Sequence, residues 1–209
     1  MRVLEVDPVA CSVQDLAAAA EWLRSGRVVA FPTDTLYGLA VDPASDDAVR
    51  ALFQLKGREA SAALPLIAES RAQVDAWCGL SASARRLADQ FWPGPLSLIC
   101  DAPQSIVPAV HGGRRSIAIR VPAHHVARTL AAAFGGPVTA TSANRSGSPP
   151  AQRAEDLSAL DDDRLLVVSG GATAGGAPST IVDARETPPL LVRDGAIPWE
   201  RVLNSLQQR

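Results

Sequence analysis

The sequence has almost no net charge and no long apolar run, and both absences limit the class of protein it encodes. Twenty Lys and Arg residues nearly balance 22 Asp and Glu residues, so the formal net charge over 209 residues is -2. This balance gives no general electrostatic reason to bind nucleic acid, although a local basic patch would be compatible with it. No apolar run reaches the roughly 20 residues of a membrane helix, and the N-terminus lacks a signal-peptide pattern. We therefore expect a cytoplasmic protein without a membrane segment.

Cysteine and lysine are both scarce. The three cysteines, Cys11, Cys78 and Cys100, lie far apart in the chain and show no C-x-x-C spacing. This pattern favours reduced, mostly buried thiols over a zinc site or a disulfide framework. Among 20 basic residues there is a single lysine, Lys56, beside 19 arginines. A lysine that persists in such an arginine-rich composition is a candidate functional residue.

Several common catalytic motifs are also missing. The sequence has no G-x-x-x-x-G-K-[ST], no G-x-G-x-x-G after a strand and no G-x-S-x-G, which argues against P-loop, Rossmann and serine-hydrolase sites. His124 and His125 are adjacent, so they point in different directions and do not form a metal-chelating pair. No general-base histidine or nucleophile stands out.

Strand-like and helix-like segments alternate along the chain, which predicts an α/β fold with a twisted mixed β-sheet flanked by helices. No linker or internal repeat divides the sequence, so we expect one domain over residues 1–209 with a core at about 12–197. Strands are expected at 3–6, 28–31, 63–68, 96–100, 116–121, 137–141, 165–168, 179–183 and 190–193. Helices are expected at 12–24, 45–56, 71–77, 81–92, 123–134, 154–160 and 198–208.

The stretch at residues 31–40 (FPTDTLYGLA) is unusually polar for the end of a buried strand. Pro32 cannot donate to a sheet ladder, so the strand should stop there. Thr33, Asp34 and Thr35 then place two hydroxyls and a carboxylate in a row. A turn needs fewer such groups, so we interpret this stretch as the wall of a pocket.

Two segments favour anion binding at the ends of predicted elements. Lys56 and Arg58 flank a glycine at a helix end, which suits either a simple helix cap or a pair of cations for a polyphosphate. The loop after Thr141 carries Ser142 and Gly147, which suit either an ordinary turn or hydroxyl and backbone N–H donors around an anion.

Two further arginines fit the same chemistry. Strand periodicity in 116–121 places Ser116, Ala118 and Arg120 on one face, which leaves a hollow with an arginine at one end. Arg193 follows a short apolar run and is a weak signal alone. Several anion-favouring groups at strand ends indicate a crevice suited to phosphoryl or nucleotidyl transfer, where positioning and charge neutralisation dominate catalysis.

Motifs along nearly the whole chain resemble the YrdC/TsaC family, the threonylcarbamoyl-AMP synthases of tRNA modification. Each motif is modest, but together and in this order they are highly specific. The chain resembles the short, single-domain form. The matching segments are 31–39 (FPTDTLYGL), 56–58 (KGR), 92–98 (WPGPLSL), 119–122 (IRVP), 141–147 (TSANRSG), 179–183 (STIVD) and 191–197 (LVRDGAI).

The resemblance implies an open α/β sandwich with a large positive cavity. It also implies a reaction in which L-threonine, bicarbonate and ATP, with Mg2+, give threonylcarbamoyl-AMP and pyrophosphate. The product would modify adenosine 37 of tRNAs that read codons beginning with A. Implied partners are transfer proteins of the TsaB, TsaD and TsaE type, with tRNA contacted indirectly or weakly.

Positions that match the family motifs receive roles by resemblance. The threonine pocket would be lined by Thr35, Arg120, Ala140 and Ser179. ATP would be contacted by Arg58, Ser116, Ser142, Asn144 and Arg193. Lys56 and Arg58 would stabilise charge at the phosphates.

The sequence departs from the family pattern at Glu59, Ala62, Ile67 and Pro150, which would border the substrates. These departures keep open an alternative: a non-catalytic or differently specific paralogue that binds tRNA or double-stranded RNA. Local arginines at 114, 115, 120 and 145 motivate this alternative, whereas the net charge argues against it.

Overall fold

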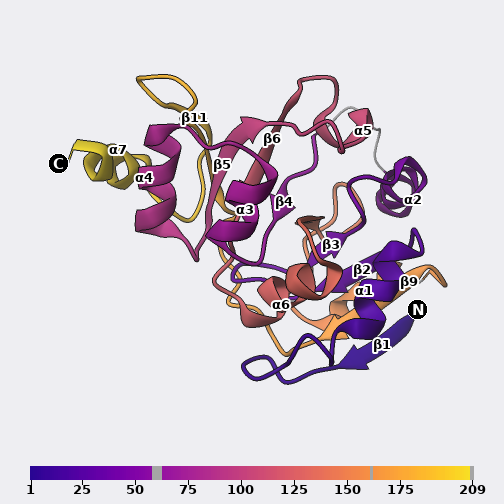
Figure 1. Ribbon diagram of the computed structural model, residues 1–209. Helices are drawn as coiled ribbons and strands as arrows, with labels where there is room; N and C mark the ends of the chain where they lie inside the picture. The colour runs from indigo at the N-terminus through magenta and orange to yellow at the C-terminus, as the bar shows by residue number, and fades with distance from the viewer. Residues whose placement is uncertain (58–62, 161, 208–209) are drawn as a thin grey trace.

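The computed structural model describes residues 1–57, 63–160 and 162–207 and has an α/β architecture with two mixed sheets (Figure 1). The five-stranded sheet has the order β1-β9-β2-β3-β8, and the six-stranded sheet has the order β11-β10-β5-β6-β4-β7. The α/β class and the mixed pairing are confirmed, with the strands divided between two sheets. Their bounds are β1 Arg2–Glu5, β2 Val28–Phe31, β3 Gly38–Ala40, β4 Leu66–Ile67, β5 Leu96–Asp101, β6 Ser116–Arg120, β7 Val138–Thr139, β8 Thr141–Ser142, β9 Leu165–Ser169, β10 Thr180–Asp183 and β11 Leu190–Arg193.

Helices cover both sheets, and several begin and end where local chemistry predicts. Ser45 caps α2 by accepting a hydrogen bond from the Ala48 amide, and Gly57 ends that helix in the left-handed conformation. Ser70 and Ser81 cap α3 and α4 in the same way as Ser45. The bounds are α1 Ala17–Arg24, α2 Asp46–Lys56, α3 Arg71–Trp77, α4 Ala82–Phe91, α5 Pro108–His111, α6 His125–Phe134 and α7 Trp199–Gln207, with a 3-10 helix, η1, at Ala154–Leu160.

Strand β2 is buried on both faces because separate apolar clusters cover it. Val29 and Phe31 pack with α1 and α6, whereas Val28 and Ala30 belong to the larger cluster that includes α2, α4 and the six-stranded sheet. Alternate side chains of a strand point to opposite faces, so both clusters require apolar residues here. This double cover holds β2 between two apolar layers, and the strand ends at Phe31, before Pro32.

Some helix and strand boundaries differ from those that the sequence predicts. Ser12 and Asp15 exchange the expected capping hydrogen bonds, but α1 begins only at Ala17. The segment 154–160 is a 3-10 helix, and the loop expected around His111 contains the one-turn helix α5. The expected strand 63–68 is reduced to β4, and 137–141 is divided into β7 and β8. The lengths of the short strands β4, β7 and β8 depend on sheet pairing, which no local pattern encodes.

All three cysteines are buried free thiols, as expected. Two of them come together although they lie 22 positions apart, with the Cys78 and Cys100 sulfur atoms separated by 2.8 Å. This contact, and then burial, raise the pKa of Cys100. Within the described ranges, no helix is both long and apolar enough to cross a membrane.

Candidate active site

A cavity of about 620 Å³ opens between the two sheets. One wall is formed by the segment after β2 and by the start of β8, and the other is a face of the six-stranded sheet. Its volume lies in the range of small-molecule sites, which run from about 300 to 1,000 Å³. Its cationic lining residues are Arg114, Arg120 and Arg193, and the described lining contains no Asp or Glu. The cavity is therefore suited to anionic ligands.

Strand β6 supplies part of the cavity floor through the alternation that the sequence predicts. Ile117 and Ile119 face the core and are at most 1% exposed, whereas Ser116, Ala118 and Arg120 line the cavity. The neighbouring strands extend this floor on both sides of β6, because Ile67 of β4 pairs with Arg120 and Ile99 of β5 pairs with Ala118. The floor thus combines an apolar surface with a cation at one end.

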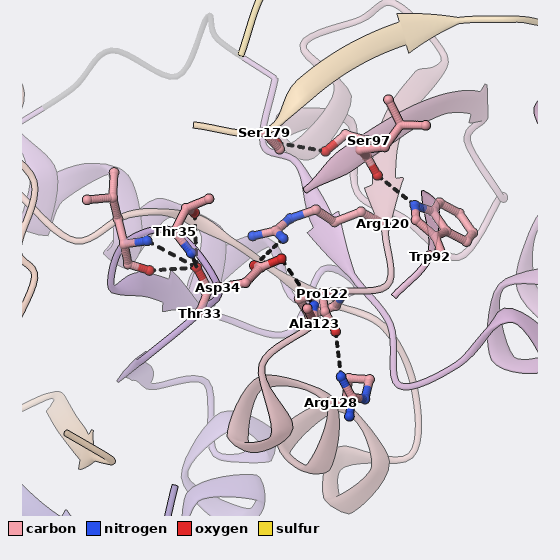
Figure 2. Close-up of polar contacts among 12 residues, drawn as sticks. Thr33, Asp34, Thr35, Trp92, Ser97, Arg120, Pro122, Ala123, Arg128 and Ser179 are labelled. Carbon is pink, nitrogen blue, oxygen red and sulfur yellow. Dashed lines mark hydrogen bonds and ion pairs between the residues drawn. The ribbon is translucent and has the colours of Figure 1, made fainter. Parts of the chain in front are cut away.

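The opposite wall is held in shape by Thr33. Its hydroxyl accepts hydrogen bonds from the amides of Thr35 and Leu36, at 3.2 and 3.3 Å, and donates to the Leu36 carbonyl at 2.7 Å. This turn leaves the Thr35 side chain on the cavity and sends the Asp34 side chain toward β6 (Figure 2). The Thr35 carbonyl also accepts from the Gly175 amide at 2.8 Å, so the segment after β9 supports this wall.

Arg120 is paired with Asp34 at the end of the floor. Arg120 Nη1 donates to Asp34 Oδ1, and the two side chains are only 8% and 11% exposed. The other carboxylate oxygen of Asp34 accepts from the Ala123 amide at 3.1 Å. Figure 2 shows the guanidinium of Arg120 lying between the 33–35 turn and the serine pair Ser97 and Ser179.

A chain of hydrogen bonds links β5, β10 and β11 at the far side of the cavity. The hydroxyl oxygens of Ser97 and Ser179 lie 2.9 Å apart, and Arg193 Nη2 donates to the hydroxyl of Ser179 at 3.0 Å and to its carbonyl at 2.6 Å. Gly195 allows this packing, because a Cβ there would lie 2.3 Å from the Pro178 carbonyl oxygen. Arg193 lies on an exposed strand, yet its guanidinium folds back over Ser179. Partial burial there, and then the charge of Arg120, lower the pKa of Arg193.

Lys56 faces inward and supports the loop that follows β8. It is 2% exposed, and its Nζ donates to the carbonyl of Ser142, to the carbonyl of Asn144 at 3.0 Å and to Asn144 Oδ1 at 3.3 Å. The Ser142 hydroxyl donates to the same Oδ1 at 2.6 Å, and the Ser146 amide donates to the Lys56 carbonyl. Lys56 and Asn144 therefore organise the loop from behind, while Ser142 lines the cavity.

The structure brings together most of the residues that the sequence singled out. Lys56 and Asn144 lie in the supporting layer just described and not in the cavity lining, and Arg58 falls outside the described residues. Those that line the cavity are Thr35, Ser116, Arg120, Ala140, Ser142, Ser179 and Arg193.

The departures from the family pattern are also partly placed. Ile67 and Pro150 line the cavity, whereas Glu59 and Ala62 lie outside the described residues. Sequence reasoning gave no role to Ser97 and did not pair Asp34 with Arg120. Ser97 lies in the motif at 92–98 and in a predicted strand. These two features together could have identified Ser97 as a pocket residue from the sequence.

Comparison with known proteins assigns the chain to a family. The family model for Sua5, YciO and YrdC proteins, described as telomere recombination, matches residues 21–195. The chain belongs to the Sua5/YciO/YrdC family.

Curated relatives in this family include threonylcarbamoyl-AMP synthases from archaea and bacteria. The chain is 36% identical over 186 residues to the one from Pyrococcus abyssi, which covers 88% of this chain and 55% of that protein. The Bacillus subtilis relative is 36% identical over 199 residues, covering 94% and 58%. The Chromohalobacter salexigens relative is 38% identical over 169 residues, covering 80% and 91%. The chain thus spans little more than half of the first two relatives and most of the third.

Solved structures show the same fold. A structure of P. abyssi Sua5 in complex with L-threonine matches with a TM-score of 0.89 and 32% identity, covering 98% of this chain and 61% of that one. Escherichia coli YciO matches with a TM-score of 0.84 over its full length, but at 22% identity this likeness concerns the fold alone. Both matches agree with the open α/β architecture of the Sua5/YciO/YrdC family.

Proposed function

We propose that the chain is a threonylcarbamoyl-AMP synthase that converts L-threonine, bicarbonate and ATP to threonylcarbamoyl-AMP and pyrophosphate. One observation carries the proposal: the residues assigned to threonine line the same cavity as Ser116, Ser142 and Arg193, three of those assigned to ATP, and the two sets meet where Arg193 Nη2 donates to the Ser179 hydroxyl. The two substrates would therefore lie next to each other. Relatives that are 36–38% identical are named threonylcarbamoyl-AMP synthases, which supports the same reaction.

Threonine is assigned to the end of the cavity that contains Arg120. The guanidinium would bind its α-carboxylate, because Arg presents a planar fork that matches two carboxylate oxygens. Thr35 and Ala140 flank the floor beside it, and Ser179 closes the side toward ATP. The threonine complex of the P. abyssi relative supports an amino-acid site in this fold.

ATP is assigned to the other end of the same cavity. Arg193 offers a cation, and Ser116 and Ser142 offer hydroxyls to a polyphosphate. Arg58 is assigned to the phosphates by its motif. Lys56 would act on this end indirectly, because its ammonium group fixes the carbonyls of the loop that carries Ser142. Asn144 would help to shape the same loop.

The chemistry needs positioning more than a strong base. The threonine amine attacks bicarbonate, with loss of water, or its carbon dioxide equivalent, with loss of a proton, and either route gives the carbamate. A carbamate oxygen then attacks the α-phosphorus of ATP in line, and the bond from that phosphorus to the bridging oxygen of pyrophosphate breaks. Arginines on the cavity wall would stabilise negative charge as it moves to the departing pyrophosphate.

Magnesium is expected from the resemblance to the family. Mg2+ prefers oxygen ligands and is often held by one or two carboxylates together with substrate phosphates. In the part of the chain that the structure describes, no cluster of three or more His, Cys, Asp or Glu side chains could hold a metal ion. The proposed reaction therefore assigns no step to a protein-held ion, and Mg2+ would enter with ATP.

The product would be passed to transfer proteins of the TsaB, TsaD and TsaE type for modification of tRNA adenosine 37. A paralogue that only binds tRNA or double-stranded RNA is less favoured, because curated relatives carry the enzyme's name and the net charge is -2.

Pyrophosphate release tests the proposal directly. Protein incubated with L-threonine, bicarbonate, ATP and Mg2+ should release pyrophosphate only when threonine is present. Arg120→Ala should lose most of this activity while keeping its far-ultraviolet circular dichroism spectrum. Folded wild-type protein without threonine-dependent release would overturn the proposed reaction, and an Arg120→Ala variant with wild-type rates would overturn the assigned site.

A further inference from the structure

We propose that Asp34 is a positioning residue for the amino-acid substrate: it holds one terminal nitrogen of Arg120 and so turns the rest of the guanidinium toward the substrate carboxylate. This inference rests on the proposed function, because it takes L-threonine as the ligand of Arg120. Asp34 itself does not line the cavity, so it would act through Arg120.

Asp34 is held in place from three directions. The turn built by the Thr33 hydroxyl fixes its backbone, and its two carboxylate oxygens accept from Arg120 Nη1 and from the Ala123 amide. The segment with Ala123 is itself fixed, since Arg128 Nη1 donates to the Pro122 carbonyl at 2.8 Å. Figure 2 shows this series of contacts running from the 33–35 turn to the start of α6. A carboxylate with both oxygens committed to fixed donors is a rigid anchor.

The contact with Asp34 occupies only one of the three nitrogens of the Arg120 guanidinium. A guanidinium has five N–H donors in a planar fork, and two of its nitrogens together can bind both oxygens of one carboxylate. Within residues 1–57, 63–160 and 162–207, the only hydrogen bond recorded for the Arg120 guanidinium is the one from Nη1 to Asp34. With Nη1 held, Nε and Nη2 are available for a carboxylate in the cavity that Arg120 lines.

Charge gives a second reason for the pair. Arg120 and Arg193 lie close enough for their charges to interact, and their cavity contains no acidic lining residue among those described. Asp34, which is outside the cavity lining, places a compensating negative charge next to Arg120. Arg120 is therefore held in one orientation beside Arg193 before an anionic substrate arrives. Such preorganisation lowers the cost of binding.

A buried ion pair is weak support for a role in stability alone. Replacing both partners with apolar residues is often neutral or stabilising in proteins, whereas orientation of a ligand-binding group requires the pair itself. A stabilising role and a positioning role therefore make different predictions about ligand binding, and a double-mutant cycle separates them.

The test compares Asp34→Asn, Arg120→Ala and the double variant by calorimetric binding of L-threonine and, separately, of ATP. Asp34→Asn keeps an oxygen that can accept from the Ala123 amide but removes the charge. We expect it to weaken threonine binding by about tenfold, by analogy with the loss of an outer partner of a metal ligand. ATP binding should change by less than about twofold, and the variant should matter little once Arg120 is already alanine.

Two further variants serve as a second test and as a control. Asp34→Glu keeps the charge but displaces it by one methylene, so it should bind threonine with intermediate affinity and carries the test if Asp34→Asn does not fold. Asp162→Asn is the matched control, because it breaks another Asp–Arg pair, with Arg164 at 2.8 Å, outside the cavity lining. It should leave both affinities unchanged.

The outcomes separate this inference from the proposed function. Threonine affinity in Asp34→Asn equal to that of the wild type, an equal loss of ATP affinity, or an undiminished effect in the Arg120→Ala background would each overturn the role of Asp34. Wild-type protein that binds threonine without releasing pyrophosphate would overturn the synthase reaction only, and the binding cycle would still decide on Asp34. Wild-type protein that binds no L-threonine would overturn both.

Discussion

Ser97 in β5 and Ser179, the residue just before the parallel strand β10, face each other in a buried position, with their hydroxyl oxygens 2.9 Å apart. Ser179 was expected to touch threonine, whereas Ser97 had no expected role. The contact shows that the Ser179 hydroxyl is held between Ser97 on one side and Arg193 on the other. Its orientation is therefore set by two strands that flank its own segment.

Replacing Ser97 tests this arrangement. Ser97→Ala should lower the free energy of unfolding by about 1 kcal/mol, the usual net value of one hydrogen bond. The Ser179 hydroxyl would keep its contact with Arg193 but lose one constraint, so the KM for threonine should rise a few-fold. Urea denaturation and steady-state kinetics measure the two effects. Ser205→Ala, a serine in α7 outside the cavity lining, is the control and should leave KM unchanged.

Arg193 should matter chiefly for ATP. Arg193→Gln removes a cation from the cavity wall and should raise the KM for ATP by roughly tenfold or more, because charge-assisted hydrogen bonds to phosphate are strong. The matched control is Arg185→Gln, which alters an arginine two residues after β10 that pairs with Asp183 and Asp101 outside the cavity lining. A KM for ATP that rises equally in both variants would contradict the assignment of Arg193.

Lys56 should be protected from chemical modification in the folded protein. It is the single lysine of the chain and is 2% exposed, so an acylating reagent has only its amine and the N-terminal amine to modify. We expect rapid labelling of one amine in native protein and of two in urea, with mass spectrometry of peptides identifying the site. Rapid labelling of Lys56 in native protein would show that its ammonium group does not stay on the carbonyls of the 141–147 loop.

His124 should make stability depend on pH. Burial lowers its pKa from the ordinary value of 6.5, against the opposing influence of nearby Asp34, and its Nδ1 has no hydrogen-bond partner among the described residues. The unfolded chain therefore takes up a proton at a higher pH than the native chain does. The contribution of His124 to stability is present above pH 6.5 and is lost as the pH falls below it.

Urea unfolding at pH 7.5 and pH 5.5 measures this contribution. The wild type should lose more stability between these two pH values than His124→Gln does, because the variant removes the titrating group. His125→Gln is the neighbouring control. Equal losses in wild type and His124→Gln would contradict the prediction, and nuclear magnetic resonance titration of the histidine Cε1 protons would show directly whether His124 titrates below 6.5.

Much of the fold follows from local chemistry. Ser45 and Gly57 bound α2 because a hydroxyl and a left-handed glycine satisfy helix ends. The alternation in 116–121 was enough to predict which side chains of β6 face a hollow. The lengths of β4, β7 and β8 were not predictable in this way, since they depend on pairing with strands distant in sequence. The capping pattern at Ser12 also placed the start of α1 too early, because the helix begins at Ala17.

The features of the candidate site also divide into those that local sequence predicts and those that depend on tertiary structure. The sequence by itself determined which residue types stand at the strand ends, because proline, glycine and periodic apolar residues act over a few positions. Only the tertiary structure decided that Asp34 meets Arg120 across 86 positions and that Lys56 turns inward beneath Ser142. Those contacts arise from the packing of two sheets against each other. A buried charge is costly unless it is paired, and no local spacing in the sequence specifies which residue its partner will be.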